Sequence, residues 1–212
     1  GCNINFKVTS HTATDNAIIS SIFVPGETVI SRASDEPEVE DLIGFLNDLG
    51  ASVEKLESGK IKITGASIFK ETSYDVCSDK SEIATFAALA VLTKGNISIK
   101  NVKRDLVLQF INFLNKIGAR FEFSEDELRV WRHGEELSPL NLEISPTPGF
   151  IPEWQSLAVL LLTQATGESL VHDTVYVDSY GYCVDLNRMG AKIDTVPPSE
   201  VGLATVVSDD SY

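Results

Sequence analysis

Basic residues and long apolar runs are both scarce in this sequence. Its 212 residues hold 17 Lys and Arg against 31 Asp and Glu, a formal net charge of -14 at pH 7. A nucleic-acid surface needs clustered Lys and Arg, so this balance argues against nucleic acid as a partner. No apolar run approaches the roughly 18 residues of a membrane-spanning helix, and no signal-peptide pattern opens the chain. We therefore expect neither nucleic acid nor a membrane as a partner.

Cysteine and methionine are rare as well. The three cysteines, Cys2, Cys77 and Cys183, lie far apart without the spacing of a metal site. Their odd number and wide spacing predict reduced thiols in a cytoplasmic protein that binds no metal. The single methionine is Met189, and the chain opens on Gly1. We expect the chain to be part of a longer polypeptide.

One pattern is present three times, at a spacing of about 70 residues. Apolar residues make up 43% of the chain, which is enough for one or two domains with a real core. Self-similarity at a fixed period indicates a copied supersecondary unit. Each copy has an apolar helix pattern, then a glycine, and then a Gly-Ala phrase about 23 residues further on. These phrases are Leu49-Gly50-Ala51, Ile117-Gly118-Ala119 and Met189-Gly190-Ala191.

The first copy predicts the order helix, strand, helix, strand, strand. Thr14-Asp15-Asn16 supplies candidate caps ahead of the first helix. Pro37 suits the first turn of the second helix, and Gly50 suits its end. The expected elements are a helix over 17–23, a strand over 28–31, a helix over 37–49, and strands over 52–55 and 60–64.

The other two copies follow the same plan. The second predicts a helix over 83–92, a strand over 97–99, a helix over 106–117 and a hairpin of strands 120–123 and 128–131. The third predicts a strand over 142–144, a helix over 153–165, a strand over 169–172 and a helix over 180–189. The segments 83–92 and 157–165 are apolar nearly all round, so we expect a core of helices with the sheets outside. The fold class is α/β.

Three segments resemble the UDP-N-acetylglucosamine enolpyruvyl transferase family, also called the 1-carboxyvinyltransferases. They are Ser10 to Asn16 with Glu36 to Leu42 behind it, Asp79 to Phe86, and Pro148 to Gln155 with Leu186 to Ala191 behind it. Their order and separations also fit, so the resemblance covers nearly all of the chain. It implies two domains, each made of three repeats arranged as an inside-out α/β barrel, with the substrates between them.

The resemblance covers only the central portion of that enzyme. Residues 1–76 resemble the last repeat of its N-terminal domain, and residues 77–212 the first two repeats of its C-terminal domain. The flanking repeats of the same polypeptide would then be further partners. Alternatively, the three copies close into a single pseudo-threefold domain.

The resemblance implies transfer of the enolpyruvyl group of phosphoenolpyruvate to UDP-N-acetylglucosamine in peptidoglycan precursor synthesis, without a cofactor. Glu153 stands where the family carries its catalytic aspartate. A glutamate also accepts a proton, although its carboxylate lies one methylene further from the backbone. The alternative is a carboxylate that merely favours the N-terminus of a helix after Pro152.

Substrate-binding residues are implied in the same way. Ser10, His11 and Thr12 match the loop that contacts the UDP diphosphate, and small hydroxyl residues before a helix suit an anion. The alternative is plain helix capping by Thr12, Thr14 or Asp15. Val175 matches the strand near the uracil side of the ligand. Beyond it, Val177-Asp178-Ser179 replaces the family's acid-asparagine-arginine triplet, so an arginine for the anionic substrates is absent.

Other functions stay open. Because most phosphoenolpyruvate ligands lie outside this stretch, we expect the isolated chain not to turn over substrate. A non-catalytic nucleotide-sugar-binding or scaffold protein of the same fold is a second hypothesis. Two related enzymes are less favoured. The motif phrases resemble the sugar-nucleotide enzyme more than 5-enolpyruvylshikimate-3-phosphate synthase, and the acidic charge argues against an RNA-cyclase relative.

Overall fold

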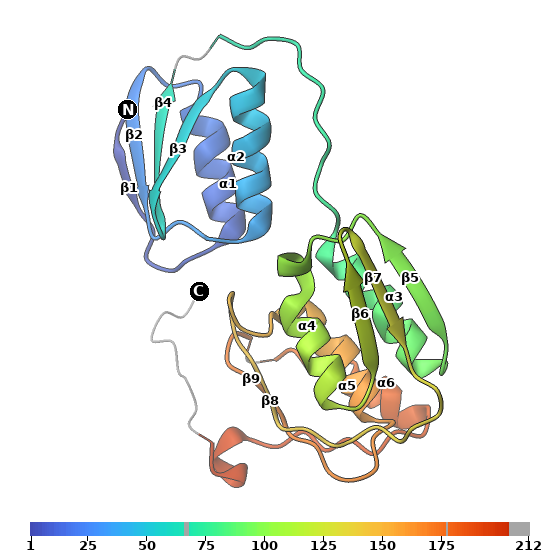
Figure 1. The fold of residues 1–212 in the computed structure, drawn as a ribbon. Helices are drawn as coiled ribbons and strands as arrows, with labels where there is room; N and C mark the ends of the chain where they lie inside the picture. Colours follow the sequence, from blue (N-terminus) through green and yellow to red (C-terminus); the bar gives the residue numbers. More distant parts are fainter. Residues whose placement is uncertain (66–67, 177, 204–212) are drawn as a thin grey trace. The chain divides into compact units, whose positions relative to one another are not determined.

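The chain divides into two compact units, Gly1–Cys77 and Ser78–Tyr212. The computed structural model describes residues 1–65, 68–176 and 178–203 (Figure 1). None of the helices in these described ranges is long and apolar enough to cross a membrane. Each unit is an α/β assembly of its own.

The first unit packs two helices on one face of a four-stranded sheet (Figure 1). The sheet order is β1-β2-β4-β3, with β1 parallel to β2 and the other pairs antiparallel. Alternating residues of the sheet, among them Ile30, Ile61 and Ile63, are buried against Ile18 of the first helix and Leu46 of the second. The elements are β1 (Asn3–Asn5), α1 (His11–Ser21), β2 (Gly26–Ser31), α2 (Pro37–Leu49), β3 (Ser52–Glu57) and β4 (Lys60–Gly65).

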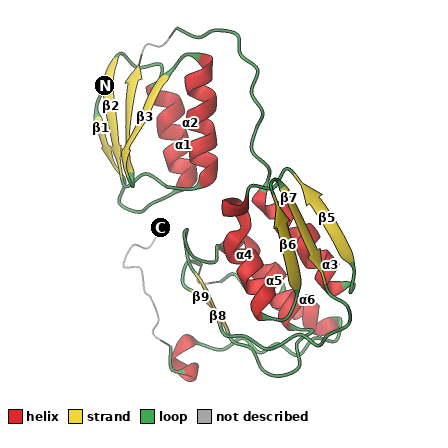
Figure 2. Cartoon of the chain, in the orientation of Figure 1, coloured by secondary structure: helices red, strands yellow, loops and turns green. Residues whose placement is uncertain are grey.

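The second unit has a three-stranded antiparallel sheet of order β5-β7-β6, and a parallel pair β8-β9 (Figure 2). The sheet strands are β5 (Asn96–Lys100), β6 (Arg120–Ser124) and β7 (Glu127–Trp131), and the pair is β8 (Leu142–Ile144) and β9 (Val171–Asp173). The helices are α3 (Lys80–Leu92), α4 (Arg104–Lys116), η1 (Pro152–Trp154), α5 (Gln155–Leu162), α6 (Cys183–Arg188) and η2 (Pro198–Val201).

Helix α3 lies at the centre of the second unit, packed against α4, α5 and the sheet. Ala84, Ala87 and Val91 are fully buried there, as expected for an interior helix. One side of this helix is nevertheless open to solvent within the described residues. Phe86 and Leu89 keep 46% and 49% of their surface exposed, because no described element of the second unit covers that side.

Most predicted elements of the first two copies are confirmed, and the hairpin of β6 and β7 falls where the alternation places it. The third copy differs. Its helices are shorter than expected, at Gln155–Leu162 and Cys183–Arg188. Within the described residues after α6 only the short η2 helix is present, whereas the first copy has β3 and β4 after its second helix.

The repeated Gly-Ala phrase is a helix C-cap. Gly50, Gly118 and Gly190 have φ of 108°, 102° and 104°, in the left-handed region that favours glycine. In each copy the following alanine N–H donates to a carbonyl five residues earlier, as Ala51 does to Leu46 at 2.8 Å. This is a Schellman motif, which ends a helix and turns the chain back toward the next strand.

An asparagine locks that turn in the first and third copies. Asn47 accepts from the Val53 N–H and donates to the Val53 carbonyl, both at 2.9 Å. Asn187 makes the same two bonds with Ile193, at 2.9 and 2.8 Å. The repeated Gly-Ala phrase in the sequence therefore marks a turn whose backbone N–H and C=O groups need hydrogen-bond partners.

Candidate functional site

The first candidate region is the N-terminus of α1. This helix begins at His11, six residues before the expected start, because Ser10 caps it: the Ser10 Oγ accepts from the Ala13 N–H at 3.3 Å. The proposed cap at Thr14-Asp15-Asn16 is therefore wrong, since those residues lie inside the helix. Ser10 is half-buried, whereas His11 and Thr12 are exposed. The Ser10 and Thr12 hydroxyls lie 3.2 Å apart.

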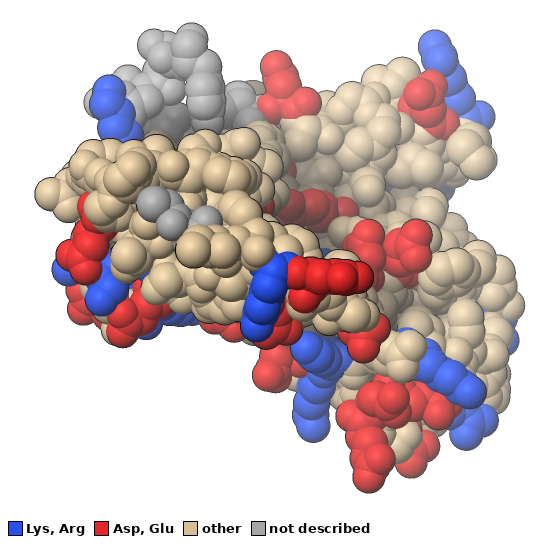
Figure 3. Space-filling view, turned by 90° about the horizontal axis from the view of Figure 1, so that it is seen from above, with Lys and Arg blue, Asp and Glu red and all other residues tan. Residues whose placement is uncertain are grey.

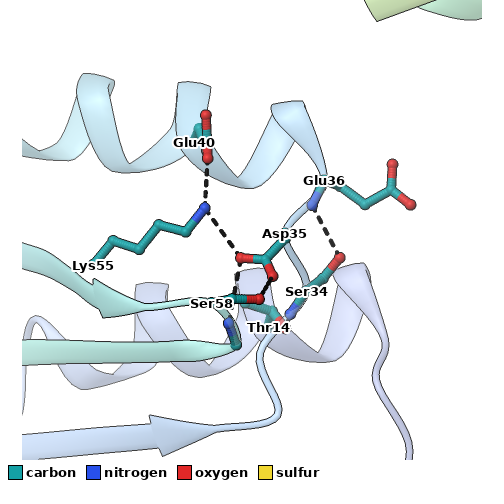
Figure 4. A network of polar contacts seen from close by, with 8 residues as sticks. Thr14, Ser34, Asp35, Glu36, Glu40, Lys55 and Ser58 are labelled. Atoms are coloured by element: carbon teal, nitrogen blue, oxygen red, sulfur yellow. Dashed lines mark hydrogen bonds and ion pairs between the residues drawn. The ribbon is translucent and has the colours of Figure 1, made fainter. Parts of the chain in front are cut away.

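Thr14 fixes this helix start to the loop before α2. Its side chain is fully buried, and its Oγ1 donates to the Ser10 carbonyl at 2.8 Å. The same Oγ1 accepts from the Ser34 N–H at 2.9 Å (Figure 4). Arg32 donates to the Lys7 carbonyl at 3.0 Å and so holds the segment before Ser10. The predicted substrate residues of this region thus rest on a constrained backbone.

An ion-pair network lies beside it. Lys55 on β3 contacts Asp35 at 3.0 Å and Glu40 of α2 at 2.5 Å (Figure 4). Asp35 also accepts from Ser58 Oγ at 2.5 Å and from the Gly59 N–H at 3.3 Å. These donors hold the pKa of Asp35 below its usual value against the opposing effect of burial. The network joins the loop at Asp35 to the β3–β4 turn.

Asp15 offers a pH-dependent prediction. Its Oδ1 is buried and makes no hydrogen bond within the described residues. Burial raises the pKa of this carboxyl; His11 opposes the shift and Glu38 adds to it. Because its pKa is raised in the folded state, Asp15 binds its proton more tightly there than in the unfolded chain. The stability of the first unit therefore falls as the pH rises from the ordinary pKa of an aspartate through the raised pKa of Asp15.

We therefore expect Asp15→Asn to stabilise the first unit at pH 7, by up to about 1 kcal/mol because the site is only partly buried. The gain should disappear near pH 3, where the carboxyl is protonated in both states. Chemical unfolding followed by amide hydrogen exchange of the first unit measures this. Asp48→Asn on α2 is a control, and an equal gain there would contradict the explanation.

The second candidate region is a pocket of about 360 Å³ in the second unit. Glu153 is an exposed residue of η1 at its rim. None of the described residues is found to donate a hydrogen bond to its carboxylate. No Lys or Arg lines the pocket among these residues, which are Pro152, Glu153, Gln155, Ser156, Asp173, Tyr176, Ser179 and Tyr182.

One pocket wall is a turn around Asp173 at the end of β9. The Asp173 Oδ1 accepts from the N–H groups of Val175 and Tyr176, at 2.8 and 3.0 Å. Its Oδ2 accepts from Gln155 Nε2 and from Ser179 Oγ. Val175 itself is 36% exposed and does not line the pocket. Val177, the first residue of the triplet Val177-Asp178-Ser179 that differs from the family pattern, lies outside the described residues.

The structure therefore groups the predicted site residues in two places. Ser10, His11 and Thr12 share the start of α1 in the first unit, while Glu153 and the turn bearing Val175 meet at the second unit's pocket. Sequence reasoning missed Asp173 and Tyr182 as pocket residues. Gln155 is the last residue of the motif phrase Pro148 to Gln155. A polar amide directly before the apolar run 157–162 was the signal that could have identified it as a pocket residue.

A larger hollow, about 570 Å³, lies on the outer face of the β5–β7–β6 sheet. Its lining is polar, with Ser98, Glu122 and Arg129 among the residues, and Arg129 donates to Asn96 at 3.0 Å. We read it as a solvated sheet face. In Figure 3 basic side chains are interspersed with acidic ones on the visible face, unlike the basic patch that nucleic acid requires.

Comparisons with known proteins give the family. The profile of the EPSP synthase (3-phosphoshikimate 1-carboxyvinyltransferase) family matches residues 1–205. The UDP-N-acetylglucosamine 1-carboxyvinyltransferase of Pelagibacter ubique is 32% identical over 193 residues, which cover 91% of this chain and 46% of that protein. The same enzyme of Protochlamydia amoebophila is 35% identical over 193 residues, covering 91% of this chain and 42% of that protein.

A solved structure agrees on the fold. The enolpyruvyl transferase NikO from Streptomyces tendae matches with a TM-score of 0.79 at 20% identity, over 92% of this chain and 49% of that one. The chain spans about half the length of the curated relatives it matches. The resemblance drawn from the three motif segments is confirmed: the chain belongs to the EPSP synthase family of enolpyruvyl transferases and is similar over most of its length to the UDP-N-acetylglucosamine 1-carboxyvinyltransferases.

Proposed function

We propose that the polypeptide carrying this chain transfers the enolpyruvyl group of phosphoenolpyruvate to UDP-N-acetylglucosamine, in cytoplasmic peptidoglycan precursor synthesis. The observation that carries the proposal is Glu153. It stands at the motif position of the family's catalytic carboxylate, and its carboxylate is exposed at the rim of a pocket. The identity to 1-carboxyvinyltransferases supports the same reaction.

Glu153 would act as the general base. The 3′-hydroxyl oxygen of the sugar forms a bond to C2 of phosphoenolpyruvate as the C2=C3 double bond opens and C3 takes up a proton from solvent, while Glu153 takes the hydroxyl proton. In the elimination, C3 gives up a proton to solvent and the C2–O bond to phosphate breaks, which restores the vinyl group and releases phosphate without a change of oxidation state, so no cofactor is needed. An exposed carboxylate with no donor among the described residues can turn toward an incoming hydroxyl.

For the nucleotide, the proposal assigns contacts to each unit separately. The first-turn N–H groups of α1 and the hydroxyls of Ser10 and Thr12 suit a diphosphate, with His11 beside them. Val175, on the turn held by Asp173, is assigned to the uracil side. In this proposal residues 1–76 are the last repeat of one inside-out α/β barrel domain, and residues 77–212 are the first two repeats of the next.

A second candidate is a nucleotide-sugar-binding protein that has lost turnover. Ser179 favours it, because the resemblance places an arginine there. The pocket carries the carboxylates of Glu153 and Asp173 and no cation among the described residues. An anionic substrate would meet repulsion there unless cations came from elsewhere in the polypeptide.

Calorimetric titration of the chain with UDP-N-acetylglucosamine tests the proposed ligand. We expect saturable binding that UMP reproduces only weakly, and no phosphate release when phosphoenolpyruvate is added to the isolated chain. Absence of binding at millimolar ligand would remove the nucleotide-sugar assignment. Turnover by the isolated chain at an ordinary enzyme rate would refute its expected inactivity.

A further inference from the structure

We propose that Gln155 is a positioning residue that fixes the pocket wall formed by Asp173, Tyr176 and Ser179. The proposal rests on the proposed function, because it concerns the same pocket. Gln155 is the first residue of α5, two residues after Glu153, and only 4% of its surface is exposed. A buried amide at this place must be satisfied by neighbours, and those neighbours come from two other segments that line the pocket.

The Gln155 amide uses both of its ends. Its Nε2 donates to Asp173 Oδ2 at 2.7 Å and to Ser179 Oγ at 2.6 Å. Its Oε1 accepts from the Tyr182 hydroxyl at 2.9 Å. Burial raises the pKa of Tyr182, so this phenol stays protonated and remains a donor at neutral pH. One side chain thus joins the start of α5 to β9 and to the segment before α6.

The hydrogen-bond network of Gln155 extends to Val175, the predicted contact for the nucleotide. Ser179 Oγ donates to Asp173 Oδ2 at 2.8 Å, and Asp173 Oδ1 holds the N–H groups of Val175 and Tyr176. The Asp173 carboxylate is therefore met by uncharged donors at the place where the family resemblance implies an arginine. A shift of Gln155 moves the turn that carries Val175 and Tyr176 relative to Glu153.

An amide suits this position and a carboxylate does not. Among the described residues, the titratable groups around Gln155 are Asp173 on β9, Glu153 on η1, Tyr180 and Tyr182 just before α6, and Cys183 at the start of α6. Of these, Asp173 accepts a hydrogen bond directly from the side-chain amide nitrogen of Gln155. In Gln155→Glu, two carboxylates would meet at that contact, and they can share it only when one holds a proton.

Amide hydrogen exchange of the full chain tests the proposal without any ligand. In Gln155→Glu at pH 8, we expect the Val175 and Tyr176 amides to exchange about tenfold faster than in the parent, after correction for intrinsic rates. At pH 5 the difference should shrink to about twofold, because a shared proton restores the contact. Gln164→Glu, at an exposed amide just beyond α5, is the matched control and should change neither rate.

Two further variants test the same network if Gln155→Glu does not fold. Tyr182→Phe and Ser179→Ala each remove one partner of the network, and each should accelerate the same two amides at both pH values. The proposal is overturned if the two amides are unaffected in all three network variants, or if Gln155→Glu shows the same loss at pH 5 and pH 8. Affinity for UDP-N-acetylglucosamine in Gln155→Glu should fall about tenfold at pH 8 and recover at pH 5. If the parent chain does not bind this ligand, the proposed function fails while the exchange result still decides the role of Gln155.

Discussion

Replacing Glu153 by glutamine is expected to lower the rate of enolpyruvyl transfer by the full-length polypeptide about 10²–10⁴-fold. Glutamine keeps the shape of the side chain but cannot accept the hydroxyl proton. Affinity for UDP-N-acetylglucosamine should change little, since the base acts on the reacting hydroxyl and adds little to ground-state binding. Phosphate release measured under saturating substrates gives kcat, and calorimetry gives the affinity.

Two further variants sharpen this result. Glu153→Asp restores the residue that the family resemblance places there, and it should keep activity far above that of Glu153→Gln. Glu143→Gln removes an exposed carboxylate of β8 in the same unit and should leave the rate unchanged. Equal rates for the parent and Glu153→Gln would assign the carboxylate to the helix start alone.

Gly50→Ala is expected to destabilise the first unit by about 2–4 kcal/mol. Part of this is the cost of a left-handed backbone conformation, about 1–2 kcal/mol for a residue with a Cβ. The rest comes from space: a Cβ at Gly50 would lie 2.7 Å from the Ile68 carbonyl oxygen. A backbone oxygen cannot move aside as a flexible side chain can, so the chain must shift. Chemical unfolding followed by far-UV circular dichroism and hydrogen exchange of the first unit measures the loss.

Gly59→Ala is the control within the same unit. Gly59 also has a positive φ, of 69°, but its nearest neighbour for a Cβ is the Ala33 carbonyl at 3.6 Å, an ordinary contact. We expect a loss of about 1 kcal/mol there. Gly190→Ala, where a Cβ would meet nothing within 4 Å, should likewise show only the conformational cost. If Gly50→Ala costs no more than these two, the close approach to Ile68 is not a constraint.

Local patterns predicted the elements that their own residues determine. The period-two alternation of β4 and the Pro37 and Gly50 boundaries of α2 were found because propensity, turn chemistry and burial all agree there. The start of α1 was misplaced because one of the two interactions that decide it is not local. Thr14 resembles a cap in sequence, but its hydroxyl bonds with Ser34, twenty residues away, and Ser10 takes the cap.

The same distinction holds for the candidate site. The motif phrase around Pro152 placed Glu153 at a helix start, as the structure has it. The partners of Gln155 come from residues 173–182, and no pattern in either segment announces the other. Nor could hydrophobicity show that α3 is exposed at Phe86, since an apolar helix can be enclosed on every side or face solvent on one.

The most direct test of the central claim is product analysis with the full-length polypeptide that carries this chain. Incubation with UDP-N-acetylglucosamine and phosphoenolpyruvate should yield the enolpyruvyl nucleotide sugar, identified by mass spectrometry, with one phosphate released for each product molecule. Binding of the nucleotide sugar without product or phosphate, under conditions where a 1-carboxyvinyltransferase relative is active, would contradict the claim and leave a binding protein of the same fold.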